Sequence, residues 1–292
     1  MPANLNSTPV TPLRFYAGSG LNVSNLYPRE NARMVWEGMR EQGEDEFLSL
    51  CRSAWAGQAK YGSAVWSGDI APTWEALFTQ VRAGQSIGIS GIPWWTSDIG
   101  GFHGGDPSDP AYQELFARWF EFGTFCPLMR VHGHREPRED VASDNPGGPN
   151  EIWSYGAEVA QICARYIHLR ESLRPYIGRV MDEAAERGIP PMRALFLEFP
   201  EDARAWEEEG EFLLGPDLLV APIVEAGARS ARVYLPAGVR WQQLLIAGGK
   251  EEAGTASYTL GDVFEGGQEV TIDAPLGCIP VFVRENTELG SC

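Results

Sequence analysis

The feature that most constrains the fold is a unit of apolar run, polar loop and helix that recurs between residues 47 and 199. The first three apolar runs are each followed by a Gly-rich or polar loop and then by a helical pattern. The predicted strands are 47–53, 86–92, 124–131 and 190–199, and the predicted helices are 72–85, 111–123 and 151–188. Strand, loop and helix in repetition predict parallel βα units.

The pattern changes at about residue 206. The stretches LLGPDLLVAPIV, RVYLP, VTIDAP and IPVFVR are short apolar runs separated by Gly and Pro, with no convincing helix among them. They predict a small antiparallel β domain. We place the boundary in the charged connector 198–210, which gives an α/β domain over 1–204 and a β domain over 205–292.

A further helix is predicted upstream of these units, over residues 28–42. Pro28 suits a first helical turn and Gly43 follows the end. The apolar residues of this segment recur at helical spacing. They are Ala32, Val35, Trp36 and Met39.

Charge and cysteine usage exclude several classes of function. The chain has 23 basic and 40 acidic residues, a net charge of −17, which disfavours nucleic acid and anionic membranes as partners. No run of 18 apolar residues is present. The five cysteines form no CxxC pair and no Cys/His cluster, so we predict no metal and no cofactor. Their odd number favours reduced thiols and, slightly, a cytoplasmic setting.

Aromatic residues and carboxylates are concentrated between Arg52 and Phe102, in the loops that follow predicted strands. Trp66-Ser-Gly-Asp69 and Trp95-Thr-Ser-Asp98 each place a carboxylate just after an aromatic ring. In a parallel barrel such loops form the catalytic face. Aromatic faces beside charged acceptors suit a sugar. The alternative is two Asp-capped turns with Trp in the core.

Seven longer motifs make the sugar interpretation specific. They are WSGDI, GIPWWTSDIGGF, FCPLMRVHGHREP, NEIWSYG, LRPYI, MRALFLEFP and FLLGPDLLVAPIVEAGARSARVYLPAG. In this order the chain resembles the C-terminal half of a glycoside hydrolase family 31 enzyme, the α-glucosidase and α-xylosidase family. The resemblance runs from about residue 14 to about residue 284.

The resemblance implies the C-terminal half of a (β/α)8 barrel followed by a small antiparallel β-sandwich. It implies retaining hydrolysis of α-linked glucosides or xylosides, with Asp69 of the W-x-G-D motif as general acid/base. Arg52 would bind the sugar in the −1 subsite, where the alternative is a simple ion pair with a core carboxylate. The other implied substrate-binding residues are Trp66, Trp94, Trp95, Asp98, Phe102 and His132.

The resemblance also implies a nucleophilic Asp that we do not find. It belongs to the strand before that of Asp69, which would lie upstream of residue 14, whereas the first acidic residue is Glu30. Asp98 is an alternative nucleophile, but the resemblance makes it a hydroxyl binder. His132 and His134 without a third ligand are a poor zinc site.

We therefore expect a fragment with little or no hydrolase activity of its own, which a complementing N-terminal half would complete. The alternative is a non-catalytic carbohydrate-binding or structural remnant. The choice between glucoside and xyloside, the oligomeric state and the compartment stay open.

Overall fold

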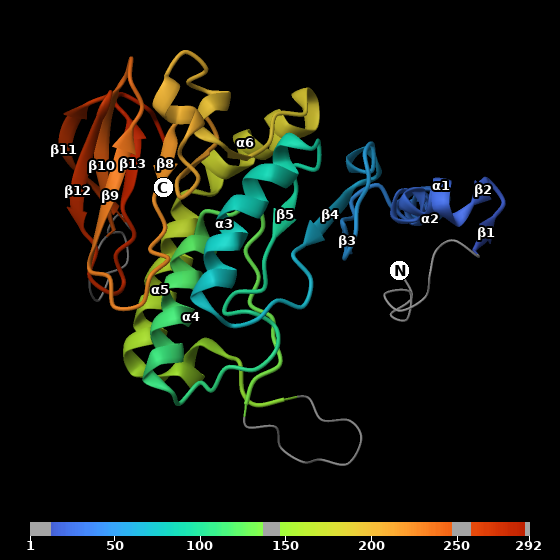
Figure 1. Ribbon diagram of the computed structural model, residues 1–292, viewed down its shortest axis with the longest axis horizontal. Coiled ribbons are helices and arrows are strands. Elements are labelled where there is room, and N and C mark those ends of the chain that lie inside the picture. Colours follow the sequence, from blue (N-terminus) through green and yellow to red (C-terminus); the bar gives the residue numbers. More distant parts are fainter. Residues whose placement is uncertain (1–12, 137–146, 247–257, 290–292) are drawn as a thin grey trace.

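The computed structural model describes residues 13–136, 147–246 and 258–289, so part of the polar loop predicted at 132–150 lies outside it. Figure 1 shows a small N-terminal arm, a central region of helices beside a short parallel sheet, and C-terminal antiparallel sheets. This order confirms the predicted fold class, an α/β barrel-related part followed by antiparallel β structure.

The arm consists of two short strands and two helices. They are β1 (Arg14–Phe15), β2 (Gly18–Ser19), α1 (Gly20–Val23) and α2 (Tyr27–Glu41). Helix α2 confirms the helix predicted at 28–42, with Pro28 in its first turn. Its ring of Trp36 lies 6.0 Å from that of Tyr61, which joins the arm to the parallel sheet.

The parallel sheet has the order β3 (Ser49–Cys51), β4 (Ser63–Trp66), β5 (Trp95–Thr96). Strand β4 lies in a stretch that we expected to be a loop. Its register pairs Val65 with Trp95 and Trp66 with Thr96. Because successive side chains alternate in direction, Val65 and Trp95 share one face of the sheet, and Trp66 and Thr96 share the other.

The strand predicted at 86–92 is wrong, because helix α3 (Trp74–Ile89) continues through most of it. Two glycines one helical turn apart allow this. A Cβ at Gly84 would stand 2.5 Å from Sδ of Met192, and a Cβ at Gly88 would stand 2.8 Å from Cβ of Pro190. The helix therefore packs closely on 190–192 up to its last turn, and it ends where Gly91 takes a φ of +80°.

The strand predicted at 124–131 is also wrong as a regular strand. Helix α4 (Pro110–Thr124), capped by Asp109, extends to its first residue. The following segment does lie along β5: Leu128 donates its N–H to Trp95 O, and Val131 forms an isolated parallel bridge with Ile99. It takes the place of a fourth strand without the regular ladder of one.

Of the strand predicted at 190–199, only β6 (Met192–Arg193) is a strand. It pairs antiparallel with β7 (Phe212–Leu214) and is followed by a 3₁₀ turn over Leu195–Leu197. The consecutive prolines 190 and 191 have no N–H to offer a ladder. The domain boundary at 204/205 stays a prediction, and β6 before it hydrogen-bonds to β7 after it.

Three more helices follow α3 in the barrel-related part. Helix α4 packs on α5 (Gly156–Ser172), and α6 (Arg174–Arg187) follows after one residue, with a Pro in its first turn. Their apolar residues share one core with the parallel sheet and with one face of the large antiparallel sheet. No helix within the described ranges is long and apolar enough to cross a bilayer.

The C-terminal part confirms the predicted antiparallel β structure. A six-stranded sheet has the order β11-β10-β13-β8-β7-β6, and β12 pairs with β9 in a second sheet. The remaining bounds are β8 (Leu218–Val220), β9 (Ser230–Leu235), β10 (Arg240–Ile246), β11 (Tyr258–Glu265), β12 (Gln268–Asp273) and β13 (Val281–Arg284).

Alternate residues of this large sheet belong to two different cores. Phe212 and Leu214 face the helices, whereas Leu213 joins Phe282 and Trp241 in a second core with the β9–β12 pair. The strands β7, β8 and β13 are therefore buried on both sides, which explains why they read as continuous apolar runs, whereas β11 at the edge is largely exposed.

Candidate active site

The strands β3, β4 and β5 all end at one edge of the parallel sheet, and the predicted site residues follow those ends. Arg52 comes directly after β3, Asp69 follows β4, and Asp98 follows β5. Parallel strands present their carboxyl ends on the same side, so the loops meet there. The structure thus brings together side chains from three consecutive units.

The first pair at this edge is Arg52 with Asp69. Nη2 of Arg52 lies 3.2 Å from Oδ2 of Asp69, and their side chains are 51% and 31% exposed. Gly68 has a φ of +79°, a conformation that turns the chain between Trp66 and Asp69 and that favours glycine. The carboxylate is accessible to solvent and held beside a cation from the neighbouring strand end.

The second pair is Asp98 with Arg130, and it is buried. Nη2 of Arg130 donates to Oδ1 of Asp98; the Asp98 side chain is completely covered, and that of Arg130 is 26% exposed. Oδ2 of Asp98 has no hydrogen-bond partner. Burial raises the pKa of Asp98 to about 6, with Arg130 and Arg135 opposing this rise and Asp69 adding to it.

Aromatic rings surround these charges. The guanidinium carbon of Arg130 lies 5.7 Å from the centre of the Trp66 ring, within range of a cation–π contact. The rings of Phe102 and His132 are 5.3 Å apart. The indole N–H of Trp66 is buried without a partner, as is that of Trp94. Buried donors of this kind are uncommon and suit a polar ligand.

His132 is exposed at the end of the segment that runs along β5. Partial burial and the charges of Arg130 and Arg135 lower its pKa below the usual 6.5, against the opposite effect of Asp69. At neutral pH the imidazole is therefore neutral, with one nitrogen as donor and the other as acceptor.

The side chains of Trp94 and Trp95 lie on opposite faces of the sheet. Trp95 is 2% exposed, its ring lies 6.5 Å from that of Phe122, and a Cβ at Gly84 would touch it, so it belongs to the core under α3 and α4. Trp94, two residues before Thr96, lies on the face that Trp66 also occupies. The structure thus leaves Trp95 apart from the other predicted site residues.

Sequence reasoning missed two arginines of the site, Arg130 and Arg135. Arg135 is fully buried and donates to the carbonyl oxygens of Ile99, Gly101 and Gly104, which fixes the loop after Asp98. A signal existed for Arg130: it precedes His132 by two residues, so in extended backbone the two side chains share one face.

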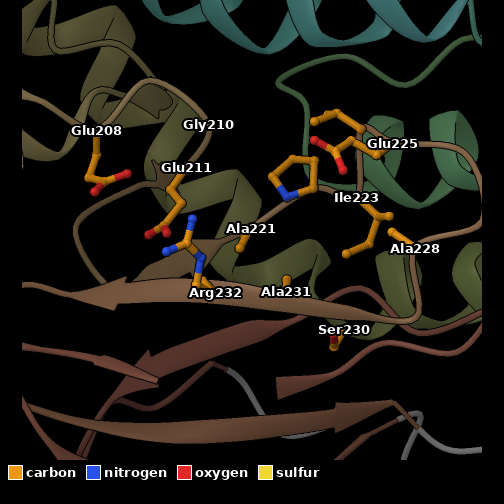
Figure 2. A pocket seen from close by; sticks show the side chains of 12 residues that line it. Glu208, Gly210, Glu211, Ala221, Ile223, Glu225, Ala228, Ser230, Ala231 and Arg232 are labelled. Carbon is orange, nitrogen blue, oxygen red and sulfur yellow. The ribbon is translucent and has the colours of Figure 1, made fainter. Parts of the chain in front are cut away.

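Figure 2 shows a different hollow, in the C-terminal part, with a volume of about 430 Å³. It is lined by Glu211, Glu208, Glu225, Arg232 and apolar side chains, and by none of the predicted site residues. Among the described residues no three His, Cys, Asp or Glu side chains are grouped as a metal site would require.

Two family models match the chain. The family 31 glycosyl hydrolase TIM-barrel domain matches residues 3–179, and the family 31 C-terminal domain matches residues 188–287. The chain belongs to glycoside hydrolase family 31. The predicted membership is thereby confirmed.

Named family 31 relatives include the α-xylosidase of Saccharolobus solfataricus, 33% identical over 282 residues, which cover 97% of this chain and 35% of the relative. Among solved family 31 structures, an α-xylosidase from a soil metagenome complexed with xylose superposes with a TM-score of 0.88 at 47% identity, covering 96% of this chain and 40% of that one. A Flavobacterium johnsoniae dextranase complexed with glucose gives a TM-score of 0.80 at 33% identity, covering 98% and 33%. The chain therefore spans roughly a third of the length of the curated relatives it matches.

Proposed function

We propose that the chain carries the general acid/base and part of the sugar site of a retaining α-glycoside hydrolase that acts on α-xylosides or α-glucosides. Asp69 is the acid/base. The observation that supports this best is its position, partly exposed at the edge where three parallel strands end and 3.2 Å from Arg52. The names of the family 31 relatives support the substrate class.

Asp69 performs two proton transfers in this proposal. It donates its proton to the glycosidic oxygen as the bond to the anomeric carbon breaks, and it later takes a proton from the water that releases the sugar. The first transfer leaves Asp69 as the carboxylate that the second step needs as a base, and the proton taken from water restores the acid. Arg52, which is 3.2 Å from Asp69, binds a sugar hydroxyl in this proposal.

Asp98 is a poor nucleophile in this arrangement. A retaining enzyme needs a carboxylate with open access to the anomeric carbon, about 5 to 5.5 Å from the acid. The Asp98 side chain has no exposed surface and is paired with Arg130. We infer that a carboxylate of a complementing polypeptide acts as nucleophile, and that the chain alone therefore hydrolyses little substrate.

A complementing polypeptide is part of this proposal. Among the described strands, β3 is paired on one side only, by β4. Leu48, Leu50 and Trp55, on and beside β3, are 53%, 42% and 44% exposed. The free edge of such a strand, with apolar side chains beside it, is a surface on which another strand can pair. The sugars in the solved family 31 structures support a carbohydrate as the other partner.

The test uses phenyl α-xyloside, because phenolate is a poor leaving group that needs a proton. We expect negligible turnover by the chain alone. Azide at high concentration should take the place of the nucleophile: it forms the C–N bond as the C–O bond breaks, Asp69 protonates the leaving oxygen, and xylosyl azide and phenol are released. Asp69→Asn should lower the azide-dependent rate by about 10²- to 10⁴-fold.

The matched control is Asp45→Asn, which removes an exposed carboxylate that pairs with Arg40 on the arm and should leave the rate unchanged. Turnover without azide would show that the chain has its own nucleophile, and Asp98 would be tested next. Xylose binding without azide-dependent turnover would favour the non-catalytic carbohydrate-binding alternative. Absence of both would reject the proposed function.

A further inference from the structure

Asp98 and Arg130 differ in what they present to a ligand. The carboxylate of Asp98 is completely covered, whereas the Arg130 side chain is 26% exposed. One oxygen of Asp98 is paired with Arg130, and the other has no partner. A covered carboxylate is costly without a cation, so Arg130 and Asp98 depend on each other.

Arg130 also reaches the other segments of the site. Its guanidinium lies over the Trp66 ring at 5.7 Å, so it links the end of β4 to the loop after β5. Its carbonyl oxygen accepts the N–H of Ile99 at 3.3 Å, which sets its main chain beside Asp98. His132 is two residues further on. Arg130 thus contacts Trp66, which precedes Asp69 in the sequence, and Asp98, which follows it.

We propose that Arg130 and Asp98 are a positioning pair: the buried carboxylate fixes the guanidinium, and the guanidinium fixes the Trp66 ring against which the sugar lies. This inference rests on the proposed function, and it changes the role of Asp98 from hydroxyl binder to anchor. Asp98 acts through Arg130, because the structure gives its carboxylate no surface on which a sugar hydroxyl could bind.

The charged groups that act on Asp98 are Arg130, Arg135 and Asp69. Protonation of Asp98 at about pH 6 removes the charge that holds Arg130, so the position of the Trp66 ring should depend on pH in that range. A purely apolar packing role for these residues would give no such dependence.

A double-mutant cycle with xylose as the probe tests the pair. Asp98→Asn and Arg130→Met should each weaken xylose binding about tenfold or more at pH 7.5, and the double variant should bind no more than about twofold worse than Arg130→Met alone. Arg130→Lys should recover part of the affinity. Losses that multiply in the double variant would show that Asp98 binds the sugar itself and would overturn the inference. Melting curves confirm that each variant is folded.

A second measurement does not depend on sugar binding. The ¹H–¹⁵N signal of the Trp66 indole, assigned by its absence in Trp66→Phe, should shift with a midpoint near pH 6. The transition should vanish in Asp98→Asn and move to higher pH in Arg130→Met. A transition that persists in Asp98→Asn would come from His132 and would overturn the inference. If the native chain shows neither xylose binding nor azide-dependent turnover, the proposed function fails, and the indole titration alone decides on the pair.

Discussion

At the scale of single residues, Glu211 is a buried carboxyl group outside the site. It is 5% exposed; Oε1 accepts the N–H of Tyr234, and Oε2 has no partner. Burial raises its pKa from 4.5 to about 8, so the folded protein holds it protonated at neutral pH. The folded state then binds a proton that the unfolded state has released, and stability falls as the pH rises from about 4.5 to about 8.

We expect Glu211→Gln to remove this dependence. The amide oxygen keeps the bond from Tyr234 and carries no charge. The variant should be more stable than the native protein at pH 7, by at most on the order of 3 kcal/mol, and the difference should shrink towards pH 5. Urea unfolding at pH 5, 7 and 8.5 measures the difference in the free energy of unfolding between the variant and the native protein. The exposed Glu207→Gln serves as the control. Equal pH dependence in the native protein and in Glu211→Gln would show that Glu211 is ionised in the fold.

Some residues of the candidate site could be predicted from the sequence, and others could not. Asp69 and Asp98 were found because each closes a turn just after an aromatic residue, and the family resemblance added Arg52. The strands that place them together, β4 and β5, were not predicted at these positions. The core position of Trp95 was not predictable, because it depends on register: Trp95 pairs with Val65, and that pairing sends its ring under the helices. The roles of Arg130 and Arg135 depend on contacts between two loops, which no single segment encodes.

At the scale of elements, α3 depends on glycine for its fit. We expect Gly84→Ala to destabilise the protein, because the new Cβ would stand 2.5 Å from Sδ of Met192 and 2.8 Å from the Trp95 ring. The higher helix propensity of Ala should raise the free energy of unfolding by up to about 1 kcal/mol, but overpacking should lower it by about 1 to 3 kcal/mol. Thermal melts and urea unfolding measure the difference.

Gly38→Ala is the matched control for that change. Gly38 also lies inside a helix, α2, and its Cβ would meet no atom within 4 Å. This substitution should leave stability unchanged or raise it by up to about 1 kcal/mol. If both variants melt alike, close packing at Gly84 does not stabilise α3.

Helices and strands were predicted correctly where a residue within the element marks its start, and incorrectly where the conformation depends on contacts with distant residues. The Pro and Asp at the start of α4 and the Pro in the first turn of α2 are local, and both helices were found. The run 86–92 reads as a buried strand by its apolar residues, yet contacts of Gly84 and Gly88 with residues 190–192 keep it helical. Short apolar runs are ambiguous until their partners are known.

At the scale of the whole molecule, a buried ion pair joins the barrel-related part to the C-terminal sheets. Arg118 and Glu121 on α4 are both fully covered and 3.0 Å apart. Arg118 donates to the carbonyl oxygens of Ala228, Ala274 and Cys278. Glu121 accepts the N–H of Gly277. The change of pattern along the sequence predicts two parts, but it cannot predict contacts between residues more than 100 positions apart.

We expect Arg118→Met to cost about 3 to 5 kcal/mol, because it leaves the Glu121 carboxylate and three carbonyl groups buried without their cation. Arg118→Met with Glu121→Gln should cost less than Arg118→Met alone, since no charge is then stranded. Arg229→Met, which breaks an exposed pair with Glu114, should cost under about 1 kcal/mol. Urea unfolding followed by Trp fluorescence measures all three. A double variant less stable than Arg118→Met would mean that Glu121 stabilises the junction without its partner, through the bond to Gly277, and that the ion pair is not what holds the two parts together.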